Sequence, residues 1–206
     1  MMRMRVRDWM NTDYPYFKAD LTVGEVRERI NALEIPLVVC VDGERKLVGT
    51  THKGDLLNAP DDTVLSELVK MPDYYVGANS FVEDAVVFLS ESKEFALPVL
   101  DNDMRVLGVL TVFEVLEFLM EATAIGERGA RISVSLTDIP GSLKKVVDVL
   151  SESDINILSI LTYPEDGGKR RVILRVDATD VDYLARLLKR SNIEVDSIIA
   201  EEGFGG

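Results

Sequence analysis

The chain repeats its own pattern, and this repeat limits the folds that are open to it. From Val23 onward, a shift of 59 residues aligns the first part of the chain with the second without gaps. The identical pairs include Val23 with Val82, Asp42 with Asp101, Gly49 with Gly108, and Leu57 with Leu116. A repeat of this length indicates a unit that cannot bury its apolar face alone, so we expect the two copies to pack on each other.

Each copy has the pattern of a β-α-β-β-α unit, and its first helix carries a start signal. Thr22 is followed three residues later by Glu25, and Ser80 by Glu83, which is the spacing of a capping box. Apolar residues at helical spacing follow both signals. We therefore predict that the first helix of each copy begins at this position.

Two short strands and a second helix complete each copy. The first strand ends at Asp42 or Asp101, and a polar turn leads from it into the second strand. The last helix is predicted to begin near Asp55 or Glu114. After this helix the composition changes, and a Gly-containing segment without a strong period indicates a linker. The predicted organisation is a pair of repeat units over 1–122 (about 1–59 and about 60–122), a linker over 123–130 and a third unit over 131–203.

The third unit has a different order of elements. Alternating and helical apolar patterns predict, in order, a strand over 131–136, a helix from 143, strands over 155–162 and 171–176, a helix over 181–188 and a strand over 194–199. The turn between the middle strands is expected at 164–168. The order β-α-β-β-α-β is the ferredoxin-like pattern. The chain as a whole is therefore predicted to be an α+β protein.

Charge and composition exclude several classes of function. The formal net charge of −13 argues against nucleic-acid binding, which needs a cationic surface. The apolar runs are too short to span a membrane, and the first ten residues lack the apolar core of a signal peptide, so we expect a cytoplasmic protein that binds no membrane. Cys40 and His52 are the only residues of their kinds, which argues against a zinc site and Cys-His catalysis. We predict neither catalytic nor metal-binding residues.

The residues at the end of each copy resemble the signature of CBS motifs. That signature is Gly, two apolar residues, Ser or Thr, two variable residues, then Asp. The corresponding segments are 49–55, with sequence Gly-Thr-Thr-His-Lys-Gly-Asp, and 108–114, with sequence Gly-Val-Leu-Thr-Val-Phe-Glu. His52 replaces the hydroxyl residue in the first copy, and Glu114 replaces Asp in the second.

The third unit resembles an ACT domain. The resemblance lies in the segment Asp-Ile-Pro-Gly-Ser-Leu at 138–143 and in Asp-Ile-Asn-Ile at 154–157. The order CBS-CBS-ACT is also similar to small bacterial regulators of the acetoin-utilisation type. Together the two resemblances cover nearly the whole chain.

The CBS resemblance implies adenine nucleotide binding in the cleft between the motifs. No cofactor is required, and AMP, ADP, ATP or S-adenosylmethionine is the expected class of regulatory ligand. The candidate residues are Gly49, His52, Lys53, Asp55, Gly108, Thr111 and Glu114. In this hypothesis Asp55 holds the ribose and His52 or Lys53 meets a phosphate. The alternative is that the carboxylates of Asp55 and Glu114 merely sit where helix starts favour them, and that the sites now only hold a dimer together.

The ACT resemblance implies a second small-ligand site, with an amino acid as the expected ligand. The candidate residues are Asp138, Ile139, Gly141, Ser142, Leu143 and Asn156. Backbone amides of this turn are expected to face the ligand carboxylate, and Asp138 or Asn156 its amino group. The alternative is that Asp138 is a helix N-cap, Pro140 opens the helix and Asn156 bonds the backbone.

These observations favour a non-catalytic regulatory protein that senses a small-molecule effector. Ligand occupancy would change the geometry of a homodimer or the affinity for a protein partner that the sequence does not identify. One alternative is a structural dimerisation adaptor with degenerate sites. The other is an enzyme that uses His52, Asp55 and Asp138, although no cluster of metal ligands or nucleophile supports it.

Overall fold

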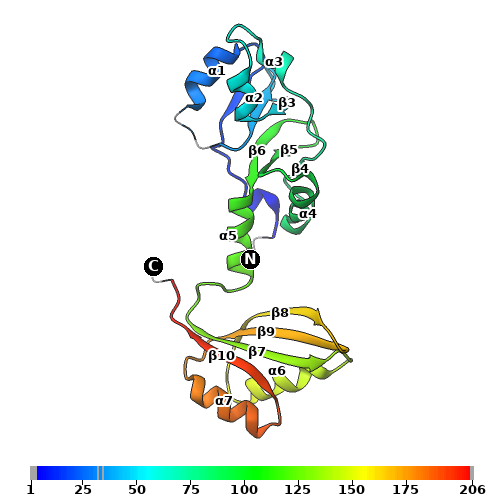
Figure 1. Cartoon of the computed structure of the whole chain (residues 1–206), viewed down its shortest axis with the longest axis vertical. Coiled ribbons are helices and arrows are strands. Elements are labelled where there is room, and N and C mark those ends of the chain that lie inside the picture. Colours follow the sequence, from blue (N-terminus) through cyan, green and yellow to red (C-terminus); the bar gives the residue numbers. More distant parts are fainter. Residues whose placement is uncertain (1–3, 32, 34, 205–206) are drawn as a thin grey trace. The chain divides into compact units, whose positions relative to one another are not determined.

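The computed structural model describes residues 4–31, 33 and 35–204, and the chain forms two compact units. The first unit covers residues 1–118 and holds both repeat copies, and the second covers 119–206 (Figure 1). The predicted α+β class is confirmed, because helices and sheets occur in both units. Among the described residues, no helix is long and apolar enough to cross a membrane.

The two copies have the same order of elements. The first copy contains β1 (Tyr16–Lys18), α1 (Val23–Ile30), β2 (Val38–Val41), β3 (Leu47–Thr51) and α2 (Lys53–Asn58). The second contains β4 (Val76–Gly77), α4 (Val82–Ser92), β5 (Ala96–Leu100), β6 (Val106–Thr111) and α5 (Val112–Ala122), which continues past the end of the first unit. A short helix precedes each copy, η1 (Val6–Asp8) and α3 (Leu65–Leu68).

The strand pairing follows the 59-residue repeat. Each copy has a three-stranded sheet, β1-β2-β3 or β4-β5-β6, with the first pair parallel and the second antiparallel. Cys40 lies opposite Gly49 in the first sheet, and Val99 lies opposite Gly108 in the second. The register shifts directly after Cys40 and directly after Val99, so even the irregularities repeat.

The first helix of each copy begins with a side-chain cap, but one of the two predicted caps is wrong. The Thr22 hydroxyl accepts a hydrogen bond from the Glu25 N–H, and the Glu25 carboxylate accepts one from the Thr22 N–H, as predicted. In the second copy Phe81 is the N-cap residue and its N–H donates to the Asp84 carboxylate. The helix therefore begins one residue later than the Ser80 signal predicted.

The segment that precedes each copy pairs with the other copy. Asn11 forms a backbone bridge with Val109 of the second copy, while Lys70 forms the equivalent bridge with Thr50 of the first copy. The segment before each copy is thus hydrogen-bonded to the other one. Between the copies, Tyr14 packs in a core cluster with buried residues of both sheets, which are Leu37, Val39, Val41, Leu47, Ala96, Leu100, Val106 and Val109.

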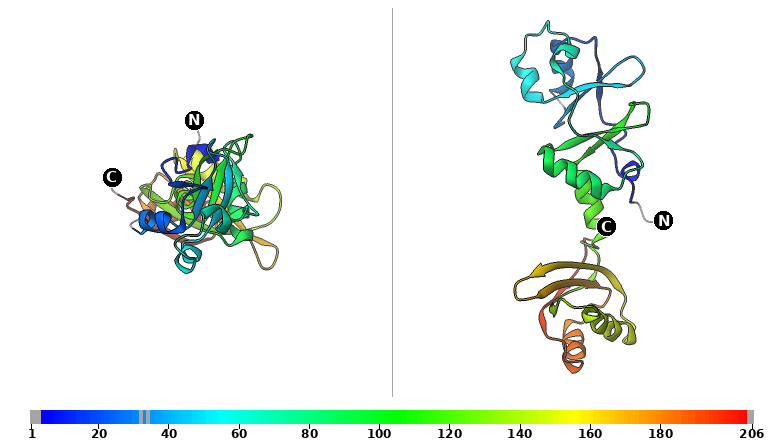
Figure 2. Two further views of the ribbon diagram at one scale, coloured as in Figure 1. Left: turned by 90° about the horizontal axis from the view of Figure 1, so that it is seen from above. Right: turned by 90° about the vertical axis from the view of Figure 1, so that its right-hand side faces the viewer.

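The second unit has the predicted ferredoxin-like topology. Its elements are β7 (Gly129–Thr137), α6 (Ser142–Glu152), β8 (Ile157–Glu165), β9 (Lys169–Val176), α7 (Val181–Arg190) and β10 (Val195–Glu201). The antiparallel sheet has the order β10-β7-β9-β8, and both helices cover one of its faces (Figure 2). Apolar residues of the helices and the sheet, such as Ile132, Val146 and Leu184, form its core.

Several boundaries in the second unit differ from the prediction. The first strand begins at Gly129, inside the segment predicted as a linker. The middle strands extend to Glu165 and start again at Lys169, so Pro164 lies in a strand and the turn is shorter than expected. Gly167 and Gly168 have positive φ angles, which lets the chain reverse within three residues.

Candidate functional site

A cavity of about 820 Å³ lies between the two repeat copies. Its lining combines the end of the first copy, the segment that follows it and the α4–β5 region of the second copy. The described residues that line it are Leu37, Thr50, Thr51, His52, Asp55, Asn58, Ala59, Leu68, Lys70, Met71, Pro72, Asp73, Tyr74, Glu91, Ser92, Glu94 and Leu97. The cavity thus has apolar walls as well as several charged groups, as small-molecule sites commonly do.

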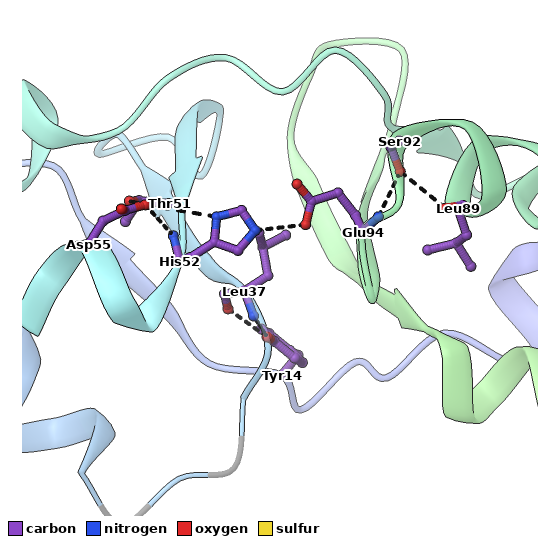
Figure 3. Close-up of polar contacts among 8 residues, drawn as sticks. All are labelled: Tyr14, Leu37, Thr51, His52, Asp55, Leu89, Ser92 and Glu94. Carbon is purple, nitrogen blue, oxygen red and sulfur yellow. Dashed lines mark hydrogen bonds and ion pairs between the residues drawn. The ribbon is translucent and has the colours of Figure 1, made fainter.

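Asp55 is held at this cavity by the start of helix α2. It is the third residue of the helix, and its Oδ2 atom accepts hydrogen bonds from the Thr51 hydroxyl at 3.2 Å and the His52 N–H at 3.4 Å (Figure 3). Among the described residues, no group donates to its Oδ1 atom. The carboxylate therefore caps the helix with one oxygen and keeps the other for a further donor.

His52 connects the two copies across the cavity. Its Nε2 atom lies 2.7 Å from Oε2 of Glu94, which belongs to the segment between α4 and β5 (Figure 3). The Glu94 N–H donates to the Ser92 hydroxyl at 3.2 Å, and that hydroxyl donates to the Leu89 carbonyl at 3.4 Å. His52 therefore joins the two copies at this cavity, although about half of its side chain stays exposed.

Two other candidate residues of the first copy do not line the cavity. The Lys53 ammonium group donates to the carbonyls of Ile30 and Leu33, both at 3.2 Å, and so binds the end of helix α1. Gly49 lies under the Lys70 backbone, since a Cβ at this position would come within 2.8 Å of the Lys70 carbonyl oxygen. In this structure the Lys53 ammonium group is thus engaged away from the cavity, and Gly49 has a packing role.

The corresponding residues of the second copy are engaged in local contacts. Glu114 accepts hydrogen bonds from the N–H and the hydroxyl of Thr111, and the N–H bond measures 2.7 Å. Gly108 packs under the Asn11 backbone, where a Cβ would lie 2.6 Å from the carbonyl oxygen. Burial of Tyr14 raises the pKa of its phenol to about 12, and the charge of nearby Glu114 adds a smaller effect in the same direction. This arrangement fits the helix-capping alternative for Glu114.

The predicted ACT residues lie in the turn before α6 and in the segment before β8. Asp138 is not the N-cap residue of α6, which begins only at Ser142, and Arg170 donates to both of its carboxylate oxygens at 3.0 and 3.1 Å. The contact with the Arg170 guanidinium lowers the pKa of Asp138. Gly141 is the N-cap residue, with φ of 89°, and helix α6 begins at Ser142.

The backbone of this turn already uses several of its donors. The N–H groups of Asp138, Ile139 and Ser142 donate to the carbonyls of Gly168, Thr137 and Ile139. Leu143 packs partly against the core of the unit. Asn156 is exposed, and its N–H donates to the Asp177 carboxylate at 3.0 Å. A hollow in this unit lies instead between α7 and β10, and none of the six predicted ACT residues lines it.

The sequence prediction missed the part of the cavity that the second copy contributes. Glu91 and Glu94 are distant in sequence from the CBS signature, and Lys70 to Tyr74 belong to the segment between the copies. The repeat predicts that the copies pack on each other, but it does not predict which side chains face the first signature. Among the described residues, no group of three or more His, Cys, Asp or Glu side chains is placed to hold a metal ion.

Several solved structures resemble somewhat more than half of this chain. A CBS domain pair/ACT domain protein from Thermotoga maritima is 30% identical with a TM-score of 0.53, over 58% of this chain and 98% of that one. The cytosolic domain of the Mg²⁺ channel MgtE, solved in complex with ATP, is 25% identical with a TM-score of 0.52. The match covers 55% of this chain and 48% of that one. CBSX2, solved in complex with AMP, shares the fold at 24% identity and a TM-score of 0.53. The match covers 57% of this chain and 97% of that one.

A curated relative matches only one part of the chain. The magnesium transporter MgtE of Thermus thermophilus is 29% identical over 120 residues, which are 55% of this chain and 27% of the transporter. The chain therefore spans about a quarter of the length of this relative.

The family assignment rests on matches that cover most of the sequence. The CBS domain family matches residues 6–62 and 65–121, and these two segments make up more than half of the chain. The TTHA0829-like ACT domain matches residues 128–198. The chain therefore belongs to the CBS domain family, as a CBS domain pair followed by an ACT domain.

Proposed function

We propose that this chain is a non-catalytic regulatory protein that binds an adenine nucleotide or a related adenosine derivative in the cavity at His52 and Asp55. CBS and ACT domains are regulatory modules, and two solved structures with similar CBS pairs contain ATP or AMP. The observation that carries the proposal is the cavity between the two copies, which has a partly unused carboxylate at the start of a helix.

The cavity supplies the two kinds of surface that an adenosine needs. Met71 is half exposed in the lining, whereas Leu37 and Leu97 are almost fully buried behind it, so the apolar surface open to a purine comes mainly from Met71. The Oδ1 atom of Asp55 accepts no hydrogen bond from the described residues and suits a ribose hydroxyl as donor.

Isothermal titration calorimetry with AMP, ADP, ATP and S-adenosylmethionine tests this proposal. Asp55→Asn should weaken binding by about tenfold or more, because a hydrogen bond to a charged group is replaced by one to a neutral amide. Glu114→Gln at the equivalent position of the second copy is the matched control and should leave the affinity unchanged. Binding of none of the four compounds would favour the adaptor alternative, and equal loss in both variants would place the ligand elsewhere.

The ACT unit and the assembly are further parts of the proposal. The exposed Ile139 and the open space around Gly141 support a small-ligand site at this turn, although Asp138 would have to exchange its contact with Arg170 for the ligand. Exposed apolar side chains of α4 and α5, such as Val87, Phe113 and Leu116, support self-association through helices of the second copy. Light scattering after size-exclusion chromatography tests the expected homodimer, and a monomer at high micromolar concentration would contradict it.

A further inference from the structure

The contact between His52 and Glu94 places a carboxylate at the position where the proposed site would meet a phosphate. Glu94 belongs to the second copy, and its Oε2 atom lies 2.7 Å from the Nε2 atom of His52 (Figure 3). The Nδ1 atom of the same ring lies 3.8 Å from Oδ2 of Asp55. The imidazole thus already lies between two carboxylates, and a phosphate would have to compete with Glu94 for it.

The remaining charges of the cavity are also unfavourable for a phosphate. Its described lining contains four carboxylates, from Asp55, Asp73, Glu91 and Glu94, and a single ammonium group, from Lys70. Two nearby cations are engaged elsewhere, since Lys53 donates to carbonyls at the end of α1 and Arg27 to the carbonyls of Leu56 and Ala59. A cleft lined by one sign of charge favours ligands of the opposite sign and disfavours those of the same sign.

The internal repeat shows that the fold does not require this contact. The 59-residue shift places Thr111 at the position of His52, and Ile35 at the position of Glu94. The repeat-related pair is therefore a hydroxyl residue of the second copy and an apolar residue of the first, and both copies still form the same order of strands and helices. The charged contact is thus present beside Asp55 and is not possible at the repeat-related positions Thr111 and Ile35, which points to a role in ligand choice.

We infer that this cavity selects adenosine derivatives whose 5′ substituent is neutral or cationic, and that Glu94 is the residue that sets this selectivity. The inference rests on the proposed function, because it takes the ribose to bind at Asp55. The negative charge of Glu94 repels a 5′-phosphate and attracts a cationic group, while the purine and ribose contacts are the same for both kinds of ligand. Selectivity then comes from a repulsive element rather than from an extra attractive contact.

Calorimetric titrations with adenosine, S-adenosylmethionine, AMP and ATP with Mg²⁺ test this inference on the full chain. Wild-type protein should bind adenosine and S-adenosylmethionine about tenfold more tightly than AMP, because like charges brought together reduce affinity. Glu94→Gln keeps a polar partner for His52 and should raise the affinity for AMP about tenfold, with adenosine changed by less than about twofold. Glu83→Gln removes the same charge from an exposed position on α4 and should change none of these affinities.

The failure of this inference differs from the failure of the proposed function. If wild-type protein binds AMP or ATP more tightly than adenosine, and Glu94→Gln leaves the order unchanged, the selectivity is overturned while the adenosine site stands. If none of the four compounds binds, the proposed function is overturned and this inference with it. A rise in AMP affinity in both Glu94→Gln and Glu83→Gln would also overturn the selectivity inference, because the change in affinity would then come from the net charge of the protein.

Discussion

Gly49 lies directly beneath the backbone of Lys70, so close that a Cβ at this position would be 2.8 Å from the carbonyl oxygen and 2.9 Å from the carbonyl carbon. The Thr50 and Lys70 backbones pair at the same place, with N–H···O distances of 2.8 and 3.1 Å. This contact holds the segment between the two copies against strand β3. The glycine of the CBS signature therefore allows two stretches of backbone to meet, which a ligand-binding role does not require.

Substitution of Gly49 by alanine should destabilise the protein by about 1–3 kcal/mol, because the added methyl group forces the Lys70 backbone to move. Gly54→Ala is the matched control, since Gly54 lies in helix α2 with open space around it. That substitution should be neutral or stabilising by up to about 1 kcal/mol. Chemical denaturation measures both changes, and equal stability of the two variants would contradict the packing role of Gly49.

Cys40 should react slowly with thiol reagents in the folded protein. The residue is fully buried in strand β2, and burial, together with the charge of Asp20, raises the pKa of its thiol to about 11. Because the thiolate is the reactive form, we expect modification at pH 8 to be at least about 100-fold slower in buffer than in denaturant. The reaction with a chromogenic disulfide measures this rate. Rapid modification of folded protein would show that the first sheet opens easily.

The stability of the first unit should depend on the ionisation of Tyr14 in alkaline solution. Burial is the main cause that raises its pKa from 10.0 to about 12, so the folded state favours the neutral phenol. This contribution to stability is fully present below pH 10 and is lost as the pH rises toward 12. Thermal unfolding at several pH values should show this loss in wild-type protein.

Tyr14→Phe separates this effect from general alkaline unfolding. The hydroxyl donates to the Leu37 carbonyl at 2.5 Å and accepts from the Leu37 N–H at 3.1 Å, so its removal leaves both groups without a partner. We expect a loss of about 1–3 kcal/mol at pH 7 and a weaker dependence of stability on pH above 10. Tyr75→Phe, at a half-exposed residue, should have little effect. An unchanged pH dependence in Tyr14→Phe would contradict the assignment.

The sequence predicted the fold well because the repeat and the apolar periods are local signals. The 59-residue shift carries over to strand registers, to the bulges after Cys40 and Val99, and to the third-residue carboxylates of α2 and α5. The one wrong helix start came from residue types alone. The shift itself places Phe81 on Thr22 and Asp84 on Glu25, which is the cap that the structure shows.

The site was predicted less completely because its contacts join distant parts of the chain. Asp55 and His52 were expected at the cleft, and both line the cavity. The partner of His52 is Glu94, 42 residues away, and nothing in the local pattern around Glu94 marks it as a site residue. Lys53 was assigned to a phosphate by its charge, but its long side chain reaches the carbonyl groups at the end of α1 instead. Side-chain direction and long-range pairing decide such roles, and periodicity carries no information on either.

A crystal structure of the full chain with saturating adenosine tests the central claim most directly. We expect adenosine in the cavity between the copies, with a ribose hydroxyl within hydrogen-bond distance of Asp55 Oδ1 and the purine against Met71. Adenosine bound beside Thr111 and Glu114, or an empty cavity in protein that binds adenosine in solution, would contradict it.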